Sequence, residues 1–565
     1  MPSASNTDPQ SHELKDMLVK KDAVTVQVAS RSNSDASDAS ELEPIISPFK
    51  EYSTIIADDD STFQLDLEDL PQGRNLGLFS TIVLFIARII GSGIWTTPSA
   101  VLLMCGGNLT AFFALWIIAA IVAFSGLYVY LELGSIIPRS GGTKVFLEFI
   151  YQRPKYLVSV VFGLYSLAFG MCLSNALVFG KYALYSFGIS SEYIDSSKSA
   201  NLAGLALVLV STIVHGVSVH HGIFVQNILG FLKLLLVAIM VFTSLYVLCF
   251  PQKLTGLENH LHYNDFFQFQ DSSIVSVSTI SAGLLQCFFT FGGWNSVHTV
   301  ASEIKDPVRT IKIAGPVSLS IAFVNYMLIN VAYFKVVPYD EFVKAGPLIG
   351  SIFFEKVLGH TLGRQFVTVS IALSSASNVF VVIYGVSRMN QEIFREGYLP
   401  FTKITASNYK HTNTPLFSLI LCCAITTFWL LILPPQGNSY NYIVSLEGYP
   451  TQIFIVLIAV GLFVLRKRYP DKHAPIRASL VGTSFIVIIS MYVLIAPFTA
   501  ATDPSTALEL LPPYHILGLL LLGLCVGYWA IMFKVLPNIR GYQLEKNTIH
   551  LEDGLSVKEW VKVWV

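Results

Sequence analysis

Two glycine-containing breaks in otherwise apolar segments carry the chemistry that this sequence offers. Gly91-Ser92-Gly93 lies in the middle of the apolar segment 78–103, and Phe291-Gly292-Gly293 lies in the middle of 277–301. Backbone groups released at such breaks find no hydrogen-bond partner in lipid. The N-terminus of a half-helix presents N–H donors to an anion, and unwound carbonyls accept from a cation. The breaks predict a binding site for a small zwitterion, with no covalent catalysis; the alternative is close packing of helices through small residues.

Two cationic side chains lie inside apolar segments, where a charge costs about 2.5–3.5 kcal/mol on insertion scales. Lys233 is flanked by leucines within 223–250, and Arg88 precedes the first break by three residues. A buried amine at Lys233 could bind a proton in one conformation and release it in another. Arg88 could pair with Glu132 or Glu303 as an inner gate, or form a static interfacial ion pair.

Other polar side chains in apolar segments have weaker assignments. His298 follows Trp294 by one helical turn, so it is either a proton relay or a buried packing residue. Ser374 and Ser375 begin a cluster that ends at Asn378; its polar groups either face Lys233 or permit close helix packing. Three weaker candidates for the wall of the site are Asn175, Thr451 and Gln452.

The elements that must position these residues are membrane helices. The chain of 565 residues is 53% hydrophobic and only 13% charged, against roughly 25% charged residues in soluble domains. Since about 20 apolar residues cross a bilayer, we expect an all-α membrane protein with twelve spans, and 339–360 could add a short re-entrant or interfacial helix. The predicted spans are 78–103, 109–136, 156–188, 202–219, 223–250, 277–301, 313–337, 365–388, 415–433, 440–465, 479–497 and 513–535.

The two breaks fall five spans apart, in spans 1 and 6. That spacing is typical of an inverted repeat of five plus five helices, the leucine-transporter-like fold, in which broken helices meet near the membrane midplane. Spans 11 and 12 are then additions to the repeat.

Charge divides the chain into three predicted parts. Residues 1–75 hold 6 Lys or Arg against 15 Asp or Glu and few aromatics, so we expect a disordered acidic tail. Residues 76–536 form the helical core, and 537–565 form a second tail whose aromatic end docks on the protein or the membrane interface. With the N-terminus inside, the inner loops hold 16 Lys or Arg and the outer loops 6, which places both termini in the cytosol.

Several classes of protein are excluded. An acidic tail on an apolar body is not a nucleic-acid binder. The seven cysteines form no CxxC pair, so no zinc or disulfide framework is expected. No GxxxxGK[ST] motif occurs, which argues against an ATP-driven pump. We expect no enzyme activity, no cofactor and no metal.

Four strings resemble a known family in order and spacing. ARIIGSGIWTTPS, LELGSIIPRSGG, FFTFGGWNSVHTVASEIKDPVRTI and SRMNQEIFREGYLP are similar to the L-type branch of the amino acid–polyamine–organocation (APC) transporters, over about 75–535. The run YLELGSIIPRSGGTKVFLE, continuing to YQRPK, together with the acidic tail, looks most like the fungal high-affinity methionine permeases.

The resemblance implies where a substrate would lie. Its carboxylate would meet the N–H groups of Ser92 and Gly93, and its ammonium the carbonyls of Ile89, Phe289 and Gly292. Phe289 would close over the substrate, although a lipid-facing filler is the alternative. The whole implied site is Ile89, Gly91, Ser92, Gly93, Ile94, Phe289, Phe291, Gly292, Trp294 and Asn295.

The resemblance also bears on coupling. Lys233 stands where sodium-coupled relatives bind their cation, next to spans 1 and 8, so it either carries a proton or replaces that cation. The L-type pattern usually has a small polar residue at Arg88. This departure argues against simple facilitated exchange.

The implied function is import of a neutral amino acid, with L-methionine preferred, across the plasma membrane by proton symport with alternating access. One alternative is a sodium-independent exchanger of large neutral amino acids. Another is a permease-like amino-acid sensor that signals through its tails. Ubiquitination machinery could act on Lys20 and Lys21. The alternative is that these lysines are only solvent-exposed charges that keep the tail soluble. The expected partners are the amino acid, protons and lipid.

Overall fold

A computed structural model describes residues 76–137, 141–170, 172–435, 438–471, 473–499, 508, 511–550 and 556–564. All of them belong to one structural unit, which begins at Ala57. The acidic tail, with Lys20 and Lys21, lies outside the described residues.

Apolar helices make up nearly all of the described chain. Nine are long and apolar enough to cross a membrane, and the bent pair α3 (Leu78–Ile89) and α4 (Gly93–Met104) brings the number to ten. Two shorter apolar helices, α13 (Val277–Thr290) and α19 (Leu416–Ile432), complete a match to the twelve predicted spans. The nine other spans are α5 (Leu109–Ile136), α7 (Leu157–Phe169) together with α8 (Leu173–Ser186), α10 (Ser199–Val217), α11 (Val219–Cys249), α14 (Pro307–Val336), α17 (Thr368–Arg395), α20 (Asn438–Arg468), α21 (Leu480–Ile495) and α22 (Tyr514–Ala530).

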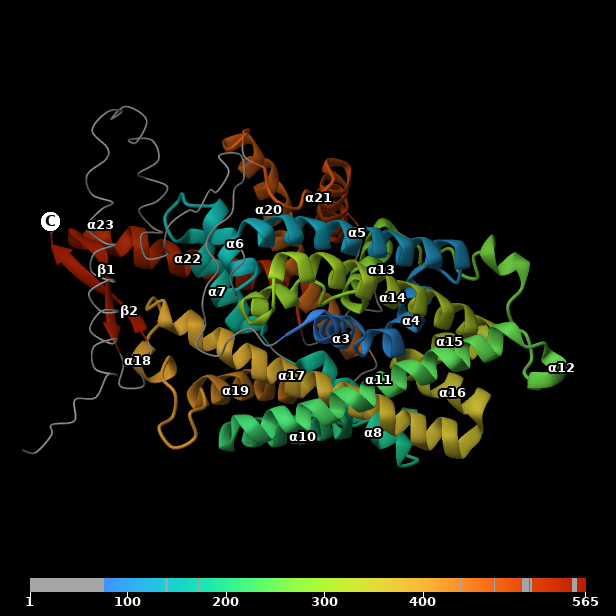
Figure 1. Cartoon of the computed structure of the whole chain (residues 1–565). Helices are drawn as coiled ribbons and strands as arrows, with labels where there is room; N and C mark the ends of the chain where they lie inside the picture. The colour runs from blue at the N-terminus through green and yellow to red at the C-terminus, as the bar shows by residue number, and fades with distance from the viewer. Residues whose placement is uncertain are drawn as a thin grey trace, which may run out of the picture. The chain divides into compact units, whose positions relative to one another are not determined.

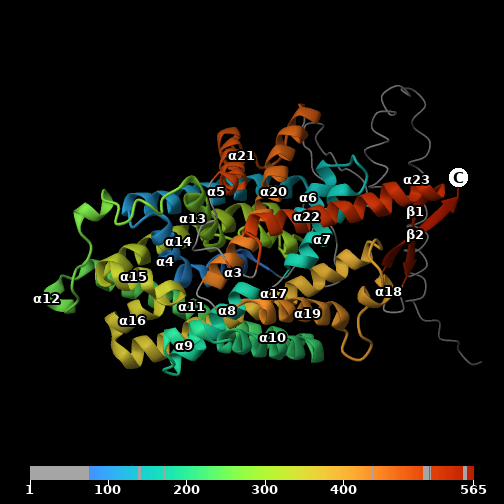
Figure 2. The ribbon, with the colours of Figure 1, turned by 180° about the vertical axis from the view of Figure 1, so that it is seen from behind.

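Short helical segments lie between the spans, and the last two, η6 and α23, follow the final span. They are α6 (Thr143–Ile150), α9 (Ser191–Ser196), α12 (Gln252–Thr255), η1 (Tyr263–Phe266), η4 (His360–Val367), α18 (Thr402–Thr405), η5 (Ala496–Phe498), η6 (Ile531–Val535) and α23 (Leu536–Arg540). Seen from behind, α10 lies beside α8 and α19 (Figure 2).

Both predicted breaks are present. The axes of α3 and α4 differ by 41° across a gap of three residues, and the two pieces lie near the centre of the view in Figure 1. In the sixth span, α13 ends at Thr290 and a turn leads to η2 (Ser296–Glu303), a tighter 3-10 helix. Gly293 in that turn has φ +98°, and a Cβ there would lie 2.7 Å from the Arg88 carbonyl oxygen. Only glycine fits this close approach of the two breaks.

The third span is also interrupted, which the sequence pattern did not predict. Helix α7 ends at Phe169 and α8 begins at Leu173. The first turn of α8 carries Ser174 and Asn175, so the interruption places two polar side chains in the interior of the helix bundle.

The predicted extra helix over 339–360 is present as α15 (Tyr339–Ala345), η3 (Gly346–Leu348) and α16 (Ile349–Gly359). These segments pack on α4. The Ser99 hydroxyl donates to the Phe342 carbonyl at 2.7 Å. The connection therefore covers one end of the first broken span.

The C-terminal segment adds the one sheet of the described chain. Strands β1 (Tyr542–His550) and β2 (Ser556–Trp564) pair antiparallel, with Lys546 opposite Trp560. Figure 1 shows the hairpin beyond α23. The predicted fold class is confirmed in its helices and its broken pair, and this hairpin is the departure from all-α structure.

The hairpin contacts the end of α17 through Glu396. Lys144 of α6 lies 3.1 Å from this carboxylate, Lys558 of β2 3.4 Å and Lys546 of β1 3.5 Å. Burial raises the pKa of Glu396, but the three lysines outweigh burial and hold the pKa well below its ordinary value. The pKa of Glu148 is raised by burial and then by the charge of Glu396. Glu396 is therefore the ionised centre of the hairpin contact.

Candidate binding site at the helix breaks

A cavity of about 320 Å³ lies at the two breaks. Nine of the ten residues predicted to form a substrate site line it, as do Asn175, Thr451 and Gln452. The lining residues are Arg88, Ile89, Gly91, Ser92, Gly93, Ala119, Val122, Ala123, Asn175, Phe288, Phe289, Thr290, Phe291, Gly292, Gly293, Trp294, Asn295, Asn378, Val382, Glu447, Gly448, Thr451, Gln452 and Ile455. The volume falls in the range of about 300–1,000 Å³ that small-molecule sites occupy.

The N-terminus of α4 lies on the wall of this cavity. Gly91, Ser92 and Gly93 donate no backbone hydrogen bond to any described residue. The Ser92 hydroxyl donates to the Asn175 side-chain oxygen at 3.0 Å. Such a helix start attracts an anion through its N–H groups and its dipole.

Gly93 leaves room for α13. A Cβ at Gly93 would lie 2.6 Å from the Thr290 hydroxyl oxygen and 2.8 Å from its Cα. The Thr97 hydroxyl is 2.9 Å from that of Thr290, and the Thr96 hydroxyl is 2.6 Å from that of Tyr440. These contacts fix the start of α4 against α13 and α20.

Two of the three carbonyls expected to face a ligand's ammonium, those of Ile89 and Phe289, already have partners. The Tyr326 hydroxyl donates to the Ile89 carbonyl at 2.9 Å and to the Thr290 carbonyl at 3.1 Å. The Gly292 N–H donates to the Phe289 carbonyl at 3.1 Å. One hydroxyl of α14 thus joins the ends of α3 and α13, and each carbonyl keeps a second lone pair for a ligand.

The Phe289 ring lies on the cavity wall, with its centroid 6.4 Å from that of Tyr440. It faces the interior, so the lipid-facing alternative does not hold. Ile94, the tenth residue, lies outside the lining set: its side chain is fully buried, and its carbonyl accepts weakly from the Tyr333 hydroxyl at 3.5 Å.

Lys233 reaches the first break from α11. Its ammonium donates to the Ala87 carbonyl and to the Asn378 side-chain oxygen, both at 2.6 Å, and its side chain is buried. Ala87 lies in the last turn of α3, where a helix presents free carbonyls and the negative end of its dipole. Lys233 therefore supplies a positive charge to the C-terminus of α3.

A chain of hydrogen bonds links Lys233 to the start of α4. The Asn378 amide donates to the Asn175 side-chain oxygen at 3.0 Å, and the same oxygen accepts from Ser92. Ser374 and Ser375, the predicted neighbours of Lys233, are buried on α17 but are not its partners. Ser375 donates to the Ile371 carbonyl of its own helix at 3.2 Å. Asn378, one turn further along, reaches Lys233 instead.

The proposed pairing of Arg88 with Glu132 is not present. The Glu132 carboxylate accepts from Arg466 Nε at 2.9 Å and from the Ala478 N–H at 2.6 Å. Arg88 instead lines the cavity, with no ion pair or hydrogen bond to a described residue. The side chain of Glu303 lies outside the described residues. Glu132 is thus part of a static contact between α5, α20 and the segment before α21.

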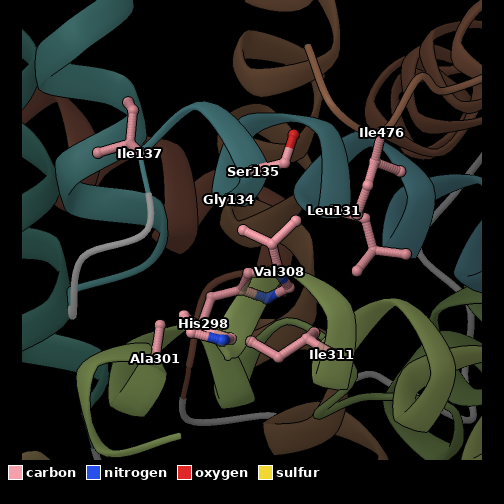
Figure 3. Close-up of a pocket in the computed structure, with 10 residues that line it drawn as sticks. Leu131, Gly134, Ser135, Ile137, His298, Ala301, Val308, Ile311 and Ile476 are labelled. Atoms are coloured by element: carbon pink, nitrogen blue, oxygen red, sulfur yellow. The ribbon is translucent and has the colours of Figure 1, made fainter. Parts of the chain in front are cut away.

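His298 lines a separate, much smaller cavity of about 10 Å³. Figure 3 shows its ring among mainly apolar side chains, including Leu131, Val308 and Ile311. The rings of Tyr130 and Phe146 lie 5.7 and 6.0 Å away. This setting favours the packing role over the proton relay.

Two functional groups at the breaks were missed, one on the cavity wall and one behind it. Glu447 of α20 is an ionisable residue inside a predicted span, so the rule that selected Lys233 and Arg88 should have selected it too. Tyr326 gave no signal, because a tyrosine in an apolar helix is common in this sequence.

Buried helices around a cavity at two helix breaks define a polytopic transport protein. Comparisons with known proteins name the particular family. The family model of the amino acid permeases matches residues 76–522, and the chain therefore belongs to the amino acid permease family.

The chain is 47% identical over 495 residues to the low-affinity methionine permease of Saccharomyces cerevisiae, covering 87% of this chain and 89% of the relative. It is 29% identical over 507 residues to the high-affinity methionine permease of the same yeast, covering 88% and 86%. It is 26% identical over 452 residues to the human cystine/glutamate transporter, covering 78% and 85%. The predicted similarity to methionine permeases is confirmed, and of these two yeast relatives the low-affinity one shares the higher identity.

Proposed function

We propose that this permease imports L-methionine across the plasma membrane by proton symport with alternating access. The methionine assignment is supported by the names of the two yeast relatives. The observation that carries the proposal is the cavity at the breaks, where free N–H groups of Ser92 and Gly93 lie close to apolar walls. A zwitterion with an apolar side chain needs N–H donors for its carboxylate and an apolar wall for its side chain.

Different parts of the cavity bind the three parts of the substrate. The substrate carboxylate binds the N–H groups at the start of α4, and the ammonium binds the carbonyls of Ile89 and Phe289. The thioether side chain lies against apolar residues of the cavity wall, such as Val122, Phe289 and Ile455. Sulfur next to an aromatic ring is a favourable contact of about 0.3–1.5 kcal/mol.

Lys233 acts as a fixed cation in this proposal. Its two hydrogen bonds of 2.6 Å join α3 to α11 and α17. It holds the break end of α3 during binding and is released when α3 moves. Both termini lie in the cytosol in this orientation, because positive loop charges favour that side, and Lys20 and Lys21 are candidate ubiquitin acceptors there.

Uptake by the purified full-length protein in liposomes tests the proposal. We expect an inward proton gradient to drive accumulation of labelled L-methionine, and unlabelled methionine to compete better than the other nineteen amino acids. An exchanger would need internal amino acid and ignore the gradient, and a sensor would show no net uptake. Either result would contradict the proposal.

A further inference from the structure

Glu447 is a half-buried acidic side chain on the wall of the cavity, and its Oε1 atom is fully buried. It lies on α20, three residues before Pro450, whose ring cannot continue the helical hydrogen bonding. Its neighbour Gly448 also lines the cavity. Glu447 therefore lines the ligand space near a point where α20 lacks one backbone hydrogen bond.

The carboxyl group of Glu447 has few partners. One oxygen accepts from the Ser174 hydroxyl at 3.2 Å, and the other has no partner among the described residues. No described lysine, arginine or histidine forms an ion pair with it. A buried carboxylate without a cation is unfavourable by several kcal/mol, whereas the neutral acid needs only ordinary hydrogen bonds.

The titratable groups that face Glu447 are few. Tyr165 of α7 donates to the Glu447 carbonyl at 3.4 Å. The Cys172 thiol, just before α8, and Tyr440 of α20 lie near its carboxyl group. Arg88 lies on the same cavity from α3. Arg88 is the one permanent cation among these groups.

Glu447 is connected to the start of α4 through two consecutive residues of α8. Ser174 donates to Glu447, and Asn175 accepts from Ser92 and from Asn378. A change of charge on Glu447 therefore acts on the turn of α8 that also contacts the predicted carboxylate site. Coupling between a proton and a substrate needs such a shared element.

We propose that Glu447 is the group that binds and releases the transported proton. This inference rests on the proposed symport. The proton adds to a carboxylate oxygen while the cavity is open to one side and leaves to the other side, with no other bond made or broken. The neutral acid accompanies the bound amino acid, and the ionised group attracts Arg88 once the proton has left.

The test compares Glu447→Gln with the wild type in two liposome assays, one driven by a proton gradient and one measuring exchange of labelled for unlabelled L-methionine. Glutamine keeps the shape of glutamate but binds no proton. We expect gradient-driven accumulation to fall at least about tenfold, while exchange continues at a reduced rate and loses its dependence on pH between about 5 and 8. Glu392→Gln on the exposed side of α17 is the matched control and leaves both assays unchanged.

Two results would overturn the inference. One is gradient-driven accumulation by Glu447→Gln at the wild-type level, and the other is loss of exchange together with accumulation, which would make Glu447 a substrate ligand. If Glu447→Gln does not fold, Ser174→Ala replaces it: removing the single partner shifts the pH profile of coupled uptake, and an unshifted profile contradicts the assignment. A wild type that exchanges but ignores the gradient overturns the symport itself, which the wild-type assay alone identifies.

Discussion

The two halves of the first span differ in how the protein holds them. Eleven of the twelve residues of α4 are buried, against three of the twelve in α3. Side chains of α4 bond to α13, α15 and α20, whereas α3 is held near the break by donors to its Ala87 and Ile89 carbonyls. The half that offers N–H donors is thus bonded to three neighbouring elements. The half that offers carbonyls packs on α14, and its end at the break is held by a few removable bonds. We infer that α4 is part of a rigid wall and that α3 is the half that moves.

The largest expected effect comes from disturbing the fixed half. Gly93→Val places a side chain within 2.6 Å of Thr290, so it separates α4 from α13 and fills the anion end of the site. We expect L-methionine uptake to fall at least about 100-fold, or about 2.7 kcal/mol, with surface expression retained. Gly77→Val just before α3, where an added Cβ would have no atom within 4 Å, is the control. Retained affinity in Gly93→Val would contradict the site.

The second-largest effect is expected from removing the hydrogen bonds between Lys233 and the end of α3. Lys233→Ala deletes both hydrogen bonds at the C-terminus of α3, and we expect uptake to fall by about 10- to 100-fold. Asn378→Ala should act in the same direction, while Ser375→Ala, whose hydroxyl bonds only within α17, should not. Uptake by Lys233→Ala within twofold of wild type would show that α3 does not depend on this residue.

A smaller effect is expected at the second donor. Tyr326→Phe removes one hydroxyl that bonds to the ends of both α3 and α13. Because a hydrogen bond contributes about 1 kcal/mol net, we expect a three- to tenfold loss of uptake. The initial rate at several methionine concentrations measures it. A loss of uptake larger than that of Lys233→Ala would contradict this ranking, in which Lys233 holds α3 more strongly than Tyr326 does.

The sequence predicted the breaks better than their surroundings. Paired glycines in apolar segments identified both broken helices, since lipid leaves few other uses for them. The partners of Lys233 could not be read from local spacing, because Asn378 meets Lys233, and Asn175 meets Asn378, only after α8, α11 and α17 pack together. The Glu132 contact was misassigned for the same reason, since its partner Arg466 lies on another helix. The hairpin was missed because its aromatic and lysine residues alternate over one short stretch in a chain dominated by helical segments.

The smallest effect on transport is expected far from the breaks, at the hairpin. Glu396→Gln removes the charge that three lysines surround. Since the folded-state pKa of Glu396 lies below its unfolded value, its stabilisation is present at neutral pH and is lost as the pH falls below about 4. We expect the variant to unfold about 2 °C below wild type at pH 7, with the gap shrinking on acidification. A gap that widens at low pH would contradict the pKa direction.

A distance measurement between spin labels tests the central claim most directly. One pair joins Phe79 on α3 to Ile121 on α5, and the reference pair joins Lys344 on α15, which packs on α4, to Ile117 on α5; all four side chains are exposed. The labels are placed in a background without Cys249 and Cys525, the exposed and half-buried cysteines. We predict that L-methionine shifts the distance between the labels at Phe79 and Ile121 and leaves that of the reference pair unchanged. A shift of the reference pair with α3 unmoved would contradict the account.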